Sequence, residues 1–204
     1  MPLETWLLFA GTVILFMATP GPSHLLMFGN ALGAGFRRAW PTALGDLSAN
    51  ALQMLAAGLG LAALVAAAGW VLGAVKLAGA AYLVWLGWRM WRHAGDEKAT
   101  IAGRRGYYLQ GFLTSASNPK AIVFFAALFP QFIDAELSFW PQFIALSATY
   151  LVIDGIFLCG WGLGAGQARA RFGDTVKRRL QRIGALTVAG TGAMLGARAL
   201  YSLR

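Results

Sequence analysis

Residues 19–22 read Thr-Pro-Gly-Pro, and residues 118–120 read Asn-Pro-Lys. Each stretch lies near the middle of a segment that is apolar and long enough to cross a membrane. Proline removes a backbone donor and obstructs the preceding turn, so we expect the helix to break at both positions. Lipid cannot satisfy the backbone groups left unpaired there, so each break must face protein or a wet cavity. Two matched breaks at this depth predict a binding cavity inside a membrane protein.

Composition also places the chain in the membrane class. Of its 204 residues, 58% are hydrophobic and 12% are charged, which leaves too few polar side chains to cover a soluble globule. The formal net charge of +9 does not indicate nucleic-acid binding, because the cations fall in short connectors and not on one folded face. Cys159 is the only cysteine, which excludes disulfide frameworks, Cys-x-x-Cys redox chemistry and thiolate metal sites.

Six stretches are long and apolar enough to form spanning helices, which need about 20 residues each. They are residues 5–31, 39–68, 69–91, 107–132, 139–166 and 183–203. We therefore predict one all-α transmembrane domain over residues 1–204. Three helices lie on either side of a charged cytoplasmic linker at 92–106, giving repeats at 1–91 and 107–204. An odd number of spans per half predicts that the two repeats are inverted relative to each other.

The distribution of Lys and Arg predicts the orientation in the membrane. Thirteen of the 17 cations lie in the connectors after the first, third and fifth helices, which the positive-inside rule places in the cytoplasm. The connector after the fourth helix carries Asp134 and Glu136 instead. Both termini are therefore predicted to face outward. The basic stretch 167–182 is interpreted as a cytoplasmic connector, which would also suit an anionic inner leaflet.

The two breaks offer features that suit an anionic ligand. Asn118 is a good N-cap and Pro119 suits a first helical position, so a half-helix should begin there. After the first break, a half-helix should begin at Pro22 or Ser23. Both N-termini then present N–H donors at the bilayer centre, and Lys120 adds a full positive charge. The predicted binding residues, for a group such as an amino acid's carboxylate, are Pro20, Gly21, Pro22, Ser23, Asn118, Pro119 and Lys120. The alternative is that the prolines only kink their helices.

Ionisable residues inside a membrane are rare enough to suggest a role. Asp46 and Asp154 lie in the second and fifth spans, the equivalent helices of the two halves. Either is a candidate to carry a proton or to hold a substrate ammonium, and its alternative role is a charge partner for Lys120 or Lys76. His24 is the third proton-coupling candidate, although a buried histidine is more often a hydrogen-bonded core residue.

Four motifs, in this order, resemble those of the lysine-exporter and homoserine/threonine-exporter (LysE/RhtB) superfamily of bacterial amino-acid exporters. They are Pro20-Gly21-Pro22, then Lys76-x-x-Gly79-Ala80-x-Tyr82-Leu83-x-x-x-Gly87, then Gly111-Phe112 leading to Asn118-Pro119-Lys120-Ala121, and finally Pro130-Gln131-Phe132. Two departures are Ser115, where the family often has Asn, and the helix-two segment from Gly45 to Ala49, which lacks a second Gly. The resemblance implies a bacterial inner-membrane exporter of amino acids or related metabolites. It further implies alternating access driven by protons, without ATP or a bound cofactor.

Other functions stay open on the sequence. An exporter of another small anion or of a metal ion is one alternative, but no His, Cys and Asp cluster has metal-ligand spacing. An ion channel is another, which matched broken helices with a midplane Lys disfavour. For a membrane-embedded enzyme, no His-Glu-x-x-His or Gly-x-Ser-x-Gly pattern occurs, so no catalytic residue is assigned. Glycine pairs at 29–33, 69–73 and 192–196 permit close helix packing, within one chain or in a homodimer.

Overall fold

A computed structural model describes residues 1–60, 69–94, 103–134, 136–171 and 174–201, and every regular element in these ranges is helical. In chain order the elements are α1 (Leu3–Ala18), α2 (Pro22–Ala34), α3 (Phe36–Ala39), α4 (Pro41–Gly58), α6 (Gly69–Arg92), α7 (Arg104–Ala116), α8 (Pro119–Val123), the π-helical turn η1 (Phe124–Leu128), the 3₁₀ turn η2 (Phe129–Phe132), α9 (Phe139–Arg171) and α10 (Asp174–Tyr201). The all-α expectation is confirmed for this part of the chain.

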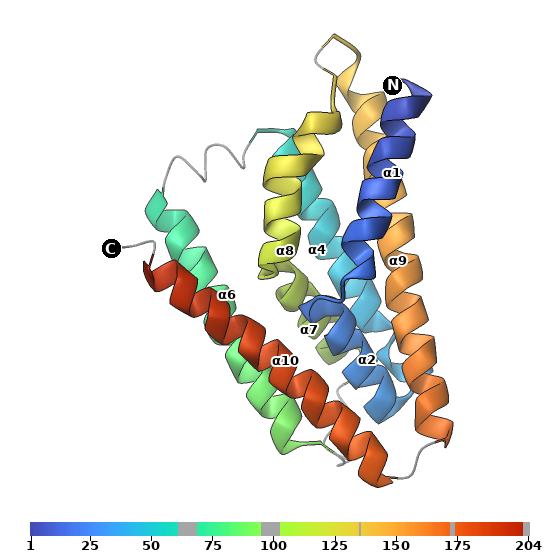
Figure 1. Cartoon of the computed structure of the whole chain (residues 1–204), viewed down its shortest axis with the longest axis vertical. Helices are drawn as coiled ribbons and strands as arrows, with labels where there is room; N and C mark the ends of the chain where they lie inside the picture. Colours follow the sequence, from blue (N-terminus) through green and yellow to red (C-terminus); the bar gives the residue numbers. More distant parts are fainter. Residues whose placement is uncertain (61–68, 95–102, 135, 172–173, 202–204) are drawn as a thin grey trace.

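Both predicted breaks are present. The axes of α1 and α2 differ by 56°, and the axes of helical segments Arg104–Ala116 and Lys120–Phe132 differ by 52°. Each bent pair is apolar and long enough to be one broken span, and Phe139–Ala168 within α9 is long enough to cross a membrane without a break. Figure 1 shows the two breaks at about the same level, near the middle of the long axis.

The described residues thus contain up to three spans by length and composition. Residues 61–68, which end the predicted second span, and the linker residues 95–102 lie outside the described part of the chain. The arrangement as six spans in two inverted repeats stays a prediction.

The basic stretch 167–182 differs from its interpretation as a connector. α9 continues to Arg171 and α10 begins at Asp174, so its described residues are helical. The last helix therefore starts at residue 174 and not at 183. Hydropathy marks only the apolar part of a helix, whereas Lys and Arg lose little side-chain freedom in a helix and readily extend it beyond the membrane.

Glycines let α4 and α7 approach each other closely. A Cβ added to Gly45 would overlap the carbonyl oxygen of Tyr108, and a Cβ added to Gly111 would overlap that of Thr42. Each helix therefore contributes one glycine that faces the other helix's backbone. This contact gives the Gly111-Phe112 motif a packing role, and it brings Asp46 on α4 near the second break.

We expect Gly111→Ala to destabilise the protein by about 1–3 kcal/mol, because the backbone carbonyl of Thr42 cannot rotate away from the new methyl group. Gly190→Ala is the matched control, since no atom lies within 4 Å of its added Cβ. That change should be neutral or stabilising by up to ~1 kcal/mol, the usual difference between Ala and Gly in a helix. Thermal unfolding of both purified variants in detergent measures the effect. Equal melting temperatures would contradict the close α4–α7 contact.

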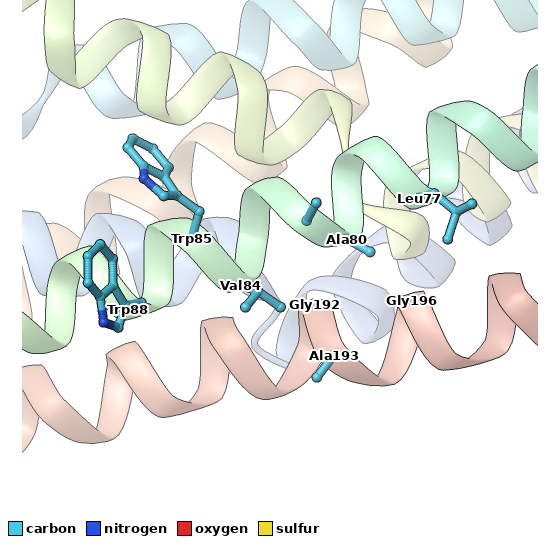
Figure 2. A pocket seen from close by; sticks show the side chains of 9 residues that line it. Leu77, Ala80, Val84, Trp85, Trp88, Gly192, Ala193 and Gly196 are labelled. Atoms are coloured by element: carbon cyan, nitrogen blue, oxygen red, sulfur yellow. The ribbon is translucent and has the colours of Figure 1, made fainter.

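The helices α6 and α10 form a pair that crosses the other helices at an angle (Figure 1). A Cβ added to Gly192 would lie 2.8 Å from the carbonyl oxygen of Ala80, so this glycine brings the two backbones together. Figure 2 shows the apolar groove along this pair, flanked by Trp85 and Trp88. The predicted close packing through Gly192 is thus found within the chain, and a homodimer stays a prediction.

Candidate functional site

The two breaks lie against each other in space. A Cβ added to Gly21 would lie 3.7 Å from Cδ of Lys120 and 3.8 Å from Nδ2 of Asn118. These are ordinary van der Waals distances, so the first break packs directly on the start of α8. Two stretches that are far apart in the sequence therefore form one site.

Each break starts a new half-helix at the residue that the sequence predicts. Asn118 caps α8, because its Oδ1 accepts a hydrogen bond of 3.1 Å from the backbone N of Lys120, and Pro119 is the first helical residue. α2 begins at Pro22, after Gly21 in an extended conformation. The N-terminal ends of both half-helices thus meet at the breaks, and each carries backbone N–H groups without a helical acceptor.

Lys120 already has partners in this structure. Its Nζ donates to the carbonyl oxygens of Phe16 and Thr19, the second at 2.6 Å, and lies 4.2 Å from the centroid of the Phe16 ring. These carbonyls belong to the C-terminal end of α1, which carries partial negative charge and acceptors that the break leaves without helical donors. The sequence predicts that Lys120 lies beside the N-terminus of a half-helix. It does not predict that Lys120 also bonds to the C-terminal end of α1.

Asp46 on α4 and Asp154 on α9 converge on one amide. Nδ2 of Asn50 donates to Oδ2 of Asp46 at 2.9 Å and to Oδ2 of Asp154 at 2.8 Å, while Oγ of Ser115 donates to Oδ1 of Asn50 at 2.8 Å. Both aspartates are 2% exposed. A single asparagine therefore links the paired helices of the two predicted repeats, and Ser115 ties that link to the second break.

The alternative role of the aspartates, as charge partners of a lysine, is found only in part among the described residues: Lys120 interacts electrostatically with Asp154 but forms no direct ion pair with it. Lys120 bonds to carbonyl oxygens of α1, and the side chain of Lys76 lies outside what the structure describes. Asp154 instead has His24 nearby, with 3.8 Å between Nε2 of the histidine and Oδ1 of the aspartate. The sequence predicted the two carboxylates as candidates on equivalent helices, and the structure brings them together, but the sequence could not identify their neighbours.

Several buried polar atoms at this site have unused hydrogen-bonding capacity. Nε2 of His24, Oγ of Ser23 and Oδ1 of Asp46 are all buried without a hydrogen-bond partner in the structure. Burying a polar atom in this way is unfavourable, and most buried polar atoms in proteins are paired. Their concentration in one place indicates a site that takes up a proton, water or a ligand during function.

These groups line a single cavity of about 20 Å³. Its walls are Phe16, Met17, Gly21, Ser23, His24, Asp46, Asn50, Asn118, Lys120, Ala121, Tyr150 and Asp154. Space of this size accommodates about one water molecule. The cavity in this structure is therefore too small for a molecule larger than water.

Packing and hydrogen bonds hold the helices together on either side of the breaks. Towards the N-terminal end of α1, aromatic side chains such as Phe124 and Tyr150 form a buried cluster with ring centroids 5.4 Å apart. Towards the C-terminal end of α2, Nδ2 of Asn30 donates to Oγ1 of Thr42 at 3.0 Å and to Oε1 of Gln110 at 3.2 Å. These bonds tie α2 to α4 and α7.

Asn50 and Ser115 belong to the site although sequence reasoning did not select them. Asn50 follows Asp46 by four residues, a spacing that places two side chains on the same helix face, so a signal for it was available. Ser115 is a departure from the pattern of the LysE/RhtB superfamily, and its place three residues before Asn118 also put it near the second break. Neither spacing nor residue type showed that the two would meet.

The geometry of breaks and carboxylates defines a class of protein. Broken helices that meet at the middle of the membrane form the binding sites of secondary transporters, and ionisable groups at that depth mark ion or substrate paths. The fold and site are those of a multi-pass helical membrane transporter.

The chain belongs to the LysE type translocator family, whose sequence model matches residues 14–201. It is 32% identical to the homoserine/homoserine lactone efflux protein of Salmonella typhi over 165 residues, covering 79% of this chain and 80% of that protein. It is 28% identical to the leucine efflux protein of Enterobacter sp. (strain 638) over 193 residues, covering 89% and 88%. An uncharacterized membrane protein of Vibrio cholerae is 32% identical over 200 residues, covering 96% and 98%. No solved structure matches the chain significantly. The predicted resemblance is thus confirmed.

Proposed function

We propose that this protein exports amino acids or closely related small metabolites from the cytoplasm in exchange for protons. The observation that carries the proposal is the shared cavity, in which two broken helices meet the buried carboxylates of Asp46 and Asp154. Relatives named as homoserine, homoserine lactone and leucine efflux proteins support this substrate class. The protein acts as a transporter and not as an enzyme, without ATP or a bound cofactor.

The substrate carboxylate is proposed to bind at the two breaks, where α2 and α8 begin. Helix N-termini attract anions through their free N–H groups and partial positive charge. Lys120 joins this site when it exchanges the carbonyl oxygens of Phe16 and Thr19 for the substrate carboxylate. Substrate binding would then loosen the link between α1 and α8 and change the geometry of both breaks.

Proton coupling is proposed to involve Asp46, Asp154 and His24. Asp46 and Asp154 interact directly with each other, and Lys120 supplies only one positive charge near the pair, so two buried negative charges there are unfavourable without a further positive charge. A proton supplies that charge when no cationic group of the substrate is present. Alternating access then requires the aromatic cluster and the Asn30 contacts to open in turn, as the two proposed inverted repeats move against each other.

Export is tested first in cells that overproduce the protein. We expect them to tolerate excess homoserine, homoserine lactone or leucine better than cells with the empty vector, because export lowers the internal concentration. Proteoliposomes should then show counterflow of the labelled substrate and acceleration by an imposed pH gradient. If no amino acid or lactone moves faster than in protein-free liposomes, the proposed function is wrong.

The orientation is proposed to place both termini and the loop 133–138 outside a bacterial inner membrane. In a Cys159→Ala background, Glu136→Cys should react with a membrane-impermeant maleimide in intact spheroplasts. Arg38→Cys should react only after lysis, although both positions are exposed in the structure. If a cysteine at position 38, 98 or 177 is labelled in intact spheroplasts, the protein has the opposite orientation to the one proposed.

A further inference from the structure

We infer that the paired carboxylates of Asp46 and Asp154 form the binding site for the substrate's ammonium group, so that transport requires a free amine and not a free carboxylate. The inference rests on the proposed function and deepens it by naming the substrate class. That class is primary amines of amino-acid size, which includes amino acids and their amides, esters and lactones.

The charges in the cavity wall favour a cation. Both carboxylates are buried there, and the amide of Asn50 that joins them is neutral and cannot compensate their charge. The ammonium of Lys120 attracts Asp154 but donates to carbonyl oxygens of α1, and it supplies one positive charge against two carboxylates. The carboxylate pair is therefore the strongest attraction that the described cavity offers to a positively charged group.

Free acceptor atoms match the donors of an ammonium group. Asn50 occupies Oδ2 of each aspartate, which leaves Oδ1 of Asp46 and Oγ of Ser23 without a partner. Oδ1 of Asp154 is 3.8 Å from Nε2 of His24, beyond hydrogen-bonding range. An ammonium group has three N–H donors, and these three oxygens come from side chains that line the same cavity.

A carboxylate has less to gain at this site. To pair with Lys120 it must replace the two hydrogen bonds that the lysine makes to Phe16 and Thr19, so its net contribution is reduced. An ammonium between the aspartates replaces only the contact between two carboxyl groups, which is unfavourable when both are charged, and it displaces no backbone hydrogen bond. Selection by charge should therefore depend chiefly on the amine.

Proton and ammonium exclude each other at such a pair. Protonation of Asp46 or Asp154 removes a negative charge and turns an acceptor oxygen into a donor, so a bound ammonium is released. The pair can thus cross with the substrate in one direction and with a proton in the other. Antiport then follows from competition for one site.

The test is inhibition of leucine counterflow in proteoliposomes by L-leucine, L-leucinamide and N-acetyl-L-leucine, with a parallel set of homoserine, homoserine lactone and N-acetylhomoserine. The assay runs at about pH 6.5, below the ~7.7–8.0 at which α-amino groups titrate, so the free amines are charged. The half-inhibiting concentration of leucinamide should lie within about tenfold of that of leucine. The half-inhibiting concentration of N-acetyl-L-leucine should be at least about tenfold higher than that of leucine. This is the effect expected for losing a charged hydrogen bond worth about 1.5–3 kcal/mol.

Asp46→Asn and Asp154→Asn should remove this preference for the amide over the N-acetyl compound, whereas Glu136→Gln in the exposed loop should leave it unchanged. If an Asn variant does not fold, the parent protein gives a second test. The leucine concentration that half-inhibits this protein should rise as the pH falls from about 6.5 to 5.5, because protons compete for the two aspartates. This range lies below the titration of α-amino groups and above that of α-carboxyl groups, so the charge of leucine does not change.

Equal inhibition by the amide and the N-acetyl compound, or no inhibition by the amide, would overturn the inference. A complete absence of leucine and homoserine counterflow would instead overturn the proposed function. The two failures are therefore distinguishable.

Discussion

Asp46→Asn and Asp154→Asn should each reduce proton-driven export by at least about tenfold, since either change removes one charge from the pair and with it a charged hydrogen bond worth about 1.5–3 kcal/mol. Asparagine has nearly the same shape as aspartate, and its Oδ1 can still accept from Asn50, so the protein should fold. The measurement is export driven by an imposed pH gradient in proteoliposomes, at matched protein content.

A second measurement on the same variants separates proton coupling from substrate binding. If the pair carries only protons, downhill exchange of labelled substrate survives in the Asn variants; if it also binds the ammonium, as we infer, exchange falls as well. Glu136→Gln, which removes an exposed carboxylate, is the control. Full gradient-driven export by both Asn variants would show that neither aspartate couples protons, and His24 would be the next residue to change.

Lys120→Ala should lower the export of substrates that carry a carboxylate while the protein still inserts in the membrane. The change removes both hydrogen bonds from Nζ to the C-terminal end of α1, together with the cation–π contact to Phe16. We expect a loss of about 1–3 kcal/mol of stability, which a folded membrane protein can tolerate. Counterflow and gradient-driven export of leucine should both fall by about tenfold, the largest contribution that our inference leaves to the substrate carboxylate.

Two further variants show what Lys120 contributes. Lys120→Met keeps the aliphatic stem and removes only the charge, so it should behave like Lys120→Ala if the charge binds the substrate. Asn118→Ala removes the cap of α8 at a cost of about 0.5–2 kcal/mol and should lower export with little loss of folded protein. If Lys120→Met binds and transports substrate like the parent, the proposed carboxylate site at the breaks is wrong.

The sequence by itself determined the membrane class and the positions of both breaks. Proline lacks a backbone donor whatever surrounds it, so the helix interruptions near Pro20 and Pro119 follow from local chemistry. The starts of the half-helices at Pro22 and after Asn118 are equally local, because capping and first-turn preferences involve only neighbouring residues. The four motifs then identified the family.

Only the tertiary structure decided which side chains meet. Helical periodicity places Asp46 and Asn50 on one face of α4, but it does not show that Asp154 lies on the other side of Asn50. The partners of Lys120 likewise depend on where α1 ends in space. Close approach through Gly45 and Gly111 sets the distance between α4 and α7, and so brings Ser115 within reach of Asn50. Contacts of this kind arise from packing between segments that are distant in the sequence, so local sequence preferences cannot predict them.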